Sequence, residues 1–334
     1  MDTSRSLVYK TLAFDSPARI PRDVWILPWA RLHYPQQVDE LITRYPSDFS
    51  GAPALGREVR TQGNEYGVGV YVDEWGCVFH NMQAGVIGEV KEAVVSTWGA
   101  LDHLRIPTER FTFDHQAVND FCRTSDKFVM AGCCPRPFER LQFLRGSQQL
   151  YYDLGEQSDE LSELLRRVHE FYLHEMELWV TTEVDGVTFM DDWGAQNRLL
   201  ISPRQWRELF KPLYKDYIDL AHAHGKKIFM HSDGFTADIL PDLIELSLDA
   251  LNTQLFTMDI EALGRQHRGK LTFWGEIDRQ HILPFGEVAD VEAAVRRVHE
   301  AFYYQGGVIA QCEFSAGGRP ENVMQVYQTW DELA

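Results

Sequence analysis

The residues best suited to chemistry are a histidine, a carboxylate and a thiol that each follow a short apolar run. His231 and Asp233 are two residues apart, and Cys312 comes after a much later apolar run. Because alternate residues of an extended chain point the same way, the imidazole and the carboxylate can face a common site. Imidazole, carboxylate and thiolate together suit Zn²⁺, with Glu276 or Cys134 as a candidate fourth ligand. The plainer alternative is that His231 and Asp233 hydrogen-bond each other or the backbone, with Cys312 merely packed.

A second group consists of acids that could move a proton. Asp191 and Asp192 stand together in Asp-Asp-Trp-Gly after another apolar run, and Glu276 follows a further one. A carboxyl group whose pKa is raised by burial or by a neighbouring acid can serve as a general acid or base. We therefore expect Asp192, Glu276 and Asp191 to be the catalytic groups, although a loop or helix-capping role is the more frequent use of Asp.

Other side chains are candidates for substrate contact. Asp73 lies in Asp-Glu-Trp-Gly, which is typical of a hairpin tip but could also fold over the site and touch the substrate. Arg136 follows Cys133-Cys134-Pro135 at an expected strand-to-helix turn, where a guanidinium could hold a substrate carboxylate. Trp193 and Trp274 follow expected strands and could wall a pocket for a flat ligand, although most aromatic residues belong to the core by default.

The elements that must position these residues are clearest in the C-terminal half, where short apolar runs alternate with amphipathic helices. Ser202 is a good N-cap, and Pro203 suits the first position of a helix that runs to about His224. Alternating strand–helix units indicate parallel strands with crossover helices. The expected strands cover residues 187–190, 227–230, 250–252, 271–274 and 308–311, and the helices after them cover 237–246, 260–266, 288–304 and 321–333.

The N-terminal half is less regular. We expect strands at 24–27 and 127–131, an ambiguous strand near 48–50, helices at 36–44, 138–144 and 160–180, and a hairpin excursion at 67–72 and 77–80. The chain length and the number of units favour a (β/α)₈ TIM barrel over a doubly wound sheet, as one domain over residues 1–334 with an N-terminal insertion. In such a barrel the catalytic groups gather at the C-terminal ends of the strands, where the candidates above are expected.

Composition narrows the classes of partner. The 334 residues include 32 basic and 50 acidic side chains, for a net charge of −18. A nucleic acid or an anionic membrane would need a basic stripe, and none is found. No apolar run is long enough to span a bilayer, the first ten residues lack a signal-peptide core, and the five cysteines are interpreted as reduced thiols. We therefore expect a cytoplasmic protein that acts on a small-molecule substrate, and a homodimer is one assembly that the sequence leaves open.

Several longer motifs are familiar. They are Phe189-Met-Asp-Asp-Trp-Gly194, Ile201-Ser-Pro-Arg-Gln-Trp-Arg-Glu-Leu-Phe-Lys-Pro212, His224-Gly-Lys-Lys-Ile-Phe-Met-His-Ser-Asp-Gly234, Pro241-Asp-Leu-Ile-Glu245 and Asp249-Ala-Leu-Asn252. With these motifs the sequence resembles the uroporphyrinogen decarboxylase superfamily over nearly the whole chain. The resemblance implies a (β/α)₈ barrel and one of two chemistries: cofactor-free decarboxylation of porphyrinogen acetates, or zinc-dependent methyl transfer between a corrinoid protein and a thiol such as coenzyme M.

The resemblance also favours the methyltransferase hypothesis over the decarboxylase hypothesis. The methyltransferases carry His-x-Cys and a distant second Cys; His231 and Cys312 resemble the first and last of these ligands, and Asp233 stands in the place of the middle one. That exchange implies a harder metal site than one with two thiolates. The decarboxylases carry Arg-Gln-Ala-Gly-Arg after the first strand, whereas residues 28–33 read Pro-Trp-Ala-Arg-Leu-His and offer only Arg31 as a substrate-binding match.

The leading hypothesis is thus a zinc-dependent methyltransferase. It would move a methyl group from an O- or N-methyl compound to a corrinoid protein, or onward to a thiol. One alternative is a decarboxylase of uroporphyrinogen or a related acid, in which Asp192 stabilises a protonated intermediate. The other is a non-catalytic barrel that binds a corrinoid or a tetrapyrrole.

Overall fold

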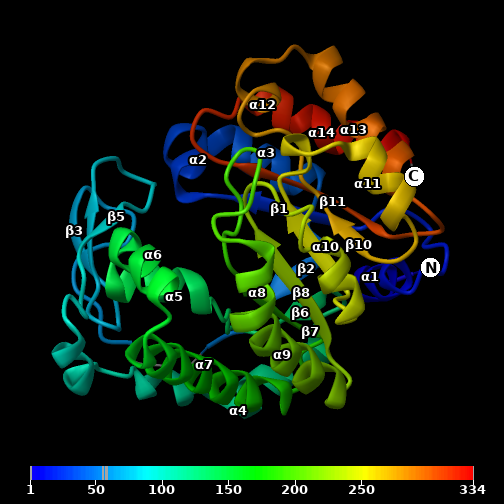
Figure 1. The fold of residues 1–334 in the computed structure, drawn as a ribbon. Helices are drawn as coiled ribbons and strands as arrows, with labels where there is room; N and C mark the ends of the chain where they lie inside the picture. Colours follow the sequence, from blue (N-terminus) through cyan, green and yellow to red (C-terminus); the bar gives the residue numbers. More distant parts are fainter. Residues whose placement is uncertain (1, 55, 57–58, 334) are drawn as a thin grey trace.

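Eight parallel strands form a nearly closed (β/α)₈ barrel in the computed structural model, which describes residues 2–54, 56 and 59–333 (Figure 1). The strand order around the barrel is β1-β11-β10-β9-β8-β7-β6-β2. The backbone N–H of Asp48, just before β2, donates to the carbonyl of Arg22 in β1 at 2.7 Å and so links the two end strands. The barrel strands are β1 (Arg22–Ile26), β2 (Phe49–Gly51), β6 (Phe128–Met130), β7 (Gly186–Met190), β8 (Lys227–Ser232), β9 (Ala250–Thr253), β10 (Thr272–Trp274) and β11 (Val308–Phe314).

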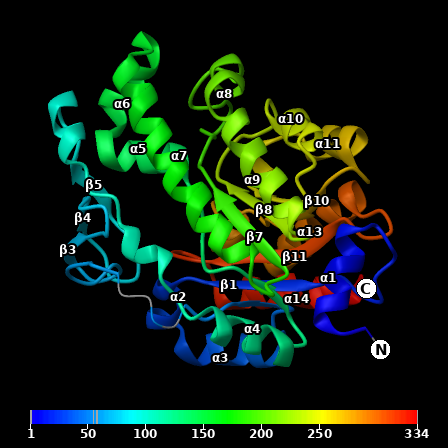
Figure 2. The same cartoon turned by 90° about the horizontal axis from the view of Figure 1, so that it is seen from below.

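Helices surround the barrel, as the expected alternation requires (Figure 2). The α-helices are α1 (Ser4–Leu12), α2 (Pro28–His33), α3 (Pro35–Arg44), α4 (His115–Thr124), α5 (Pro137–Arg145), α6 (Ser147–Glu156), α7 (Asp159–Val180), α8 (Pro203–Leu209), α9 (Lys211–Ala223), α10 (Leu240–Glu245), α11 (Ile260–His267), α12 (Ile282–Phe285), α13 (Val288–Phe302) and α14 (Pro320–Glu332). Short 3₁₀ turns are η1 (Trp98–His103), η2 (Thr108–Phe111) and η3 (Leu255–Thr257). Within the described residues, no helix has the length and hydropathy needed to cross a membrane.

The helix expected after Ser202 shows how sequence shapes these elements. The Ser202 hydroxyl accepts a hydrogen bond from the backbone N–H of Gln205 at 3.1 Å, so this residue caps α8 as expected. The single predicted helix is, however, divided into α8 and α9. Pro212 lies in the first turn of α9, and a proline that lacks an N–H cannot continue the preceding helix.

Aromatic side chains fill the barrel interior. Phe49, Phe128, Phe229 and Trp274 belong to one buried cluster. Val8 and Leu12 of α1 join the same cluster, so this helix covers one end of the barrel. The other end, at the C-terminal ends of the strands, is not covered by α1.

A small antiparallel sheet stands apart from the barrel on the side of α5 and α6 (Figures 1 and 2). Its strands are β3 (Gly69–Val72), β4 (Val78–Asn81) and β5 (Glu89–Glu92), so the predicted hairpin is confirmed and extended by a third strand. Asp73 shapes the hairpin turn, because its Oδ1 accepts from the backbone N–H of Trp75 at 3.0 Å and of Cys77 at 2.8 Å. The plain interpretation of Asp73 as a turn residue accounts for these contacts.

Candidate metal centre

Three ligand-type side chains meet at the C-terminal ends of β7 and β8. Asp192, His231 and Asp233 each offer an atom within 4.8 Å of the others. His231 Nε2 lies 3.7 Å from Asp192 Oδ1 and 3.5 Å from Asp233 Oδ1. The strand register explains why these side chains are close. Met190 of β7 pairs with His231 of β8, so Asp192 and Asp233, each two positions further along, lie side by side at the mouth of the barrel.

Two glycines hold the loops that carry the carboxylates against each other. A Cβ on Gly194 would lie 2.0 Å from the backbone nitrogen of Phe235, and one on Gly234 would lie 2.1 Å from the carbonyl oxygen of Gly194. Gly234 also has a φ of +76°, a conformation that other residues seldom adopt. The backbone N–H of Asp233 donates to Asp192 Oδ1 at 2.9 Å and completes the connection.

The orientation of His231 is fixed by a chain of buried amides. Its Nδ1 lies 2.6 Å from Oδ1 of Asn252, its partner in β9. The Asn252 amide nitrogen donates to the Trp274 carbonyl and, at 3.0 Å, to Oε1 of Gln311. Because that nitrogen is engaged, Oδ1 is the acceptor and His231 Nδ1 carries the proton. In the neutral imidazole, Nε2 then presents a lone pair to two carboxylates.

Such an arrangement fits a metal ion. Three acceptor atoms that face one another repel unless a cation or a shared proton lies among them. In addition, Asp233 Oδ1 is buried and has no hydrogen-bond partner within the described part of the chain. A buried acceptor without a partner is unfavourable and indicates that something else completes the site. One imidazole and two carboxylates form a set that Zn²⁺ accepts.

A positively charged group lies beside the triad. Arg279 contacts Asp233 Oδ2 through Nη2, and its Nη1 donates to Glu313 Oε1 at 2.8 Å. Its Nε lies 3.3 Å from Glu276 Oε1. Burial raises the pKa of Glu276 to about 8, although Arg279 opposes that shift. The Glu276 carboxyl group is therefore protonated at neutral pH and can donate a proton at the edge of a small cavity of about 40 Å³.

Cys312 does not join this group, which corrects the ligand set expected from the sequence. Strand β11 continues to Phe314, so Cys312 lies inside the strand instead of after it. Its neighbours Gln311 and Glu313 contact the residues of the mouth, whereas Cys312 Sγ lies 3.8 Å from the Tyr327 hydroxyl in α14. Burial also raises the pKa of the Cys312 thiol to about 12. Asp192 supplies the third ligand-type atom instead.

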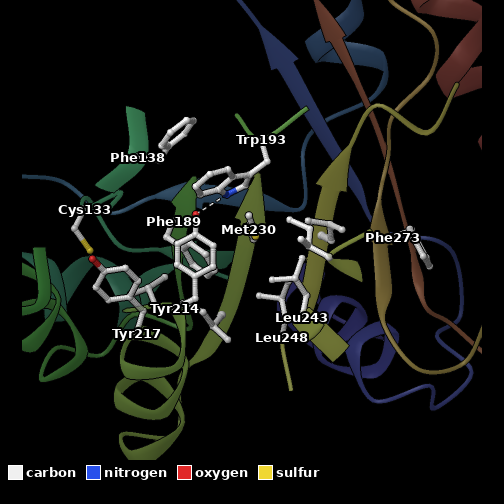
Figure 3. Close-up of a cluster of buried hydrophobic side chains, with 14 of the residues drawn as sticks. Cys133, Phe138, Phe189, Trp193, Tyr214, Tyr217, Met230, Leu243, Leu248 and Phe273 are labelled. Atoms are coloured by element: carbon white, nitrogen blue, oxygen red, sulfur yellow. Dashed lines mark hydrogen bonds between the residues drawn. The ribbon is translucent and has the colours of Figure 1, made fainter. Parts of the chain in front are cut away.

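Asp191 and Trp193 also face away from the mouth, contrary to expectation. Asp191 is fully buried and accepts hydrogen bonds from the backbone N–H groups of Phe138 (3.1 Å) and Glu139 (2.8 Å) in the first turn of α5. Figure 3 shows Trp193 packed against Phe138, and its indole N–H donates to the Tyr214 hydroxyl at 2.7 Å. Both residues therefore hold the helix layer in place.

Trp274 and Arg31, which were expected to contact the substrate, lie away from the triad. The Trp274 ring is buried in the barrel interior, where its N–H donates to Asp23 Oδ2 at 3.1 Å and the ring forms a T-shaped contact with Trp25. It therefore fills the core and walls no open pocket. Arg31 is exposed on α2.

Asp73, Cys134 and Arg136 line a second cavity of about 480 Å³, between the small sheet and the helices α5 and α7. Cys134 belongs to this cavity and not to the triad. Arg136 caps the start of α5, and its Nη1 donates to Glu139 Oε2 at 3.0 Å.

Two functional features carry no clear signal in the sequence. Arg279 lies in a loop after β10, where no periodic pattern marks it. Asn252 was expected at a strand end and Gln311 inside a strand, but only the barrel shows that Asn252 contacts His231 and that Gln311 accepts a hydrogen bond from Asn252. Their polar character inside otherwise apolar strands is the one signal that could have singled them out.

Asn252 provides the first prediction. Asn252→Ala is expected to lower the affinity of the triad for a divalent metal ion by about 10- to 100-fold, because His231 loses the acceptor that fixes its tautomer. Competition with a chromophoric chelator measures this. Asn252→Asp keeps an acceptor oxygen and should restore most of the affinity. Unchanged affinity in Asn252→Ala would show that the amide chain does not position the histidine.

Comparisons with known proteins bear on the family and the fold of the chain. A family model described as uroporphyrinogen decarboxylase (URO-D) matches residues 71–333. A methyltransferase from Methanosarcina mazei has a similar structure, with a TM-score of 0.68 and 16% identity over 100% of this chain and 99% of that one. No curated protein sequence matches significantly.

Two further structures match more weakly. One is an endo-β-1,4-xylanase from Gloeophyllum trabeum, with a TM-score of 0.45 and 11% identity over 96% of this chain and 98% of that one. The other is the 3-keto-D-glucoside 4-epimerase YcjR from E. coli, with a TM-score of 0.41 and 12% identity over 65% of this chain and 84% of that one.

Proposed function

The chain belongs to the uroporphyrinogen decarboxylase family, and we propose that it is a zinc-dependent methyltransferase that moves a methyl group from an O- or N-methyl compound to a corrinoid protein. The observation that carries this proposal is the cluster of Asp192, His231 and Asp233, with a buried Asp233 oxygen that has no hydrogen-bond partner among the described residues. The likeness to a methyltransferase over the whole chain supports the same choice.

The residues at the C-terminal mouth of the barrel would have three different roles in this reaction. Asp192, His231 and Asp233 would hold the metal, which when bound supplies Lewis acidity toward the heteroatom that carries the methyl group. Glu276 keeps a proton on a buried carboxyl group beside Arg279. It can give that proton to the oxygen or nitrogen as the methyl group passes to the corrinoid, so that a neutral alcohol or amine departs. Arg279 holds Asp233 and Glu313 and keeps these acids in place.

The ligand types favour oxygen and nitrogen donors over thiols. A thiolate ligand donates charge to zinc, whereas carboxylates leave the metal harder and more electrophilic. With Asp192 in the group and Cys312 turned away, the set contains no sulfur. A polycarboxylate substrate fits less well, because the carboxylates of Asp192 and Asp233 lie at the mouth and repel it.

Substitution of Asp233 tests the proposal. Wild-type protein, purified without chelator, should contain near-stoichiometric zinc and demethylate O- or N-methyl donors with a corrinoid protein as acceptor. Asp233→Ala should weaken zinc binding by at least about tenfold. Asp233→Cys should retain the metal and shift preference toward thiol acceptors by about tenfold, because it introduces a soft ligand. Elemental analysis and methyl-transfer assays with both acceptor types provide the measurements.

Asp278→Asn is the matched control, since it removes one acid from the same mouth without touching the triad. Zinc content and rates should remain at wild-type levels in that variant. Efficient methylation of free thiols by the wild type, together with unchanged zinc and rate in Asp233→Ala, would contradict the proposal.

A further inference from the structure

The second cavity has the size and lining of a binding site for a small molecule. Its volume is about 480 Å³, within the usual range for ligand pockets. The small sheet, the loop between β6 and α5, and the helices α5 and α7 enclose it. Aromatic rings from these elements line it, namely Tyr71, Phe79, Phe143 and Tyr172.

Two guanidinium groups in the cavity have unused donors. Arg136 and Arg140 lie one helical turn apart at the start of α5, where the Arg140 N–H donates to the Arg136 carbonyl at 2.8 Å. Arg140 is only 6% exposed; its Nη1 contacts Asp73 and its Nε donates to the Tyr172 hydroxyl at 3.4 Å. Its Nη2 has no partner in the described ranges. Arg136 donates through Nη1 to Glu139 and also hydrogen-bonds the Cys134 side chain, which leaves other N–H groups of its guanidinium for a ligand.

The acids in the same cavity are mostly occupied. Asp73 accepts two backbone N–H groups on one oxygen and contacts Arg140 with the other. Glu74 Oε1 accepts from Arg110 at 2.6 Å. Glu65 stands at the exposed rim, and its side chain has no hydrogen-bond partner among the described residues. The interior therefore has spare donors, whereas the spare acceptor lies at the entrance.

We propose that this cavity binds an organic carboxylate with a planar, apolar body. The carboxylate would accept hydrogen bonds from Arg136 and Arg140, since guanidinium groups match its geometry. The aromatic walls would contact the flat body. Glu65 would weaken the binding of any anion, because it places a negative charge at the entrance. The site needs no metal and stands independently of the methyl-transfer proposal.

Calorimetry with 2-naphthoate tests this site in chelator-treated protein, so that failure of the zinc site does not affect the result. We expect saturable binding of 2-naphthoate at one site. The uncharged 2-naphthamide, which has nearly the same shape, should bind at least about tenfold more weakly because it lacks the charge that Arg136 and Arg140 recognise. Inorganic phosphate should also bind more weakly, since it makes no use of the aromatic walls.

Three variants locate the binding. Arg136→Gln should lower affinity for 2-naphthoate by about tenfold, the loss expected for one charged hydrogen bond. Glu65→Gln should raise it by about threefold, because the repulsion at the entrance disappears. Arg166→Gln is the control: Arg166 is an exposed arginine on α7 that pairs with Glu163 and Glu170, and its loss should change nothing.

Several outcomes would overturn the proposal. They are absence of 2-naphthoate binding to the wild type, equal affinities for 2-naphthoate and 2-naphthamide, phosphate binding as tight as 2-naphthoate, and equal affinities in Arg136→Gln and Arg166→Gln. Thermal melting confirms that each variant folds. If Arg136→Gln does not fold, the direction of the change in Glu65→Gln decides, because only an anion site in this cavity gains affinity there.

Discussion

His231→Ala is expected to purify with less than about a tenth of the zinc found in the wild type and to lose methyl transfer by at least about 100-fold. His231 is the single nitrogen donor of the triad, and its Nε2 faces both carboxylates. Without it, Asp192 and Asp233 remain, and Arg279 already holds one oxygen of Asp233. Elemental analysis of protein prepared without chelator measures the zinc content, and the demethylation assay measures the rate.

Cys312→Ser is the control for His231→Ala, because it tests whether the thiol is a metal ligand. Its hydroxyl can replace the thiol beside Tyr327, so zinc content and activity should stay within about twofold of the wild type. Loss of zinc in Cys312→Ser, with zinc retained in His231→Ala, would mean that the metal binds on the outer side of the last strand. The triad would then have to be abandoned.

Glu276→Gln is expected to change how stability depends on pH. Burial raises the pKa of Glu276 from 4.5 to about 8 in the folded protein, so the folded state binds this proton more tightly than the unfolded chain. The resulting stabilisation is fully present below pH 4.5 and is lost as the pH rises to about 8. At roughly 1.4 kcal/mol per pKa unit, the difference is on the order of 5 kcal/mol. Glutamine does not ionise and should remove this part of the pH dependence.

Urea unfolding of chelator-treated protein at pH 5 and pH 8.5 measures the effect. The wild type should lose more stability across this interval than Glu276→Gln, whereas Asp278→Asn should follow the wild type. Parallel curves for the wild type and Glu276→Gln would contradict a neutral, buried carboxyl group. Methyl transfer should fall by about 10²- to 10⁴-fold in Glu276→Gln, and wild-type activity should decline above pH 8, because the proton donor is lost in both cases.

The barrel was predictable because its signals are local and repeated. Apolar runs of strand length alternate with amphipathic helices, and each strand expected in the C-terminal half is confirmed with its bounds within three residues of the prediction. In the less regular N-terminal half the predicted elements are present, including the short strand β2 and the hairpin of the small sheet, but α1, α2, α4, α6 and β5 were not predicted.

Side-chain direction was harder to predict, because it depends on where a strand stops. The strand before Cys312 was expected to end at Gln311, yet β11 continues to Phe314 and turns the thiol outward. Likewise, Asp191 and Asp192 are neighbours whose side chains point to opposite sides, and pairing with β8 decides which one reaches the mouth. Arg279 was missed because a loop residue has no periodicity, and only the three acids around it reveal its role.

The helix that covers the closed end of the barrel has a consequence for the order of events during synthesis. Val8 and Leu12 of α1 are made early, but the apolar cluster that receives them includes Trp274 and Ile309, which are made late. The apolar face of α1 therefore has no complete docking site while the ribosome produces most of the chain. During that interval it is open to chaperones or to unwanted association with other nascent chains. Completion of β11 supplies the last part of its docking site.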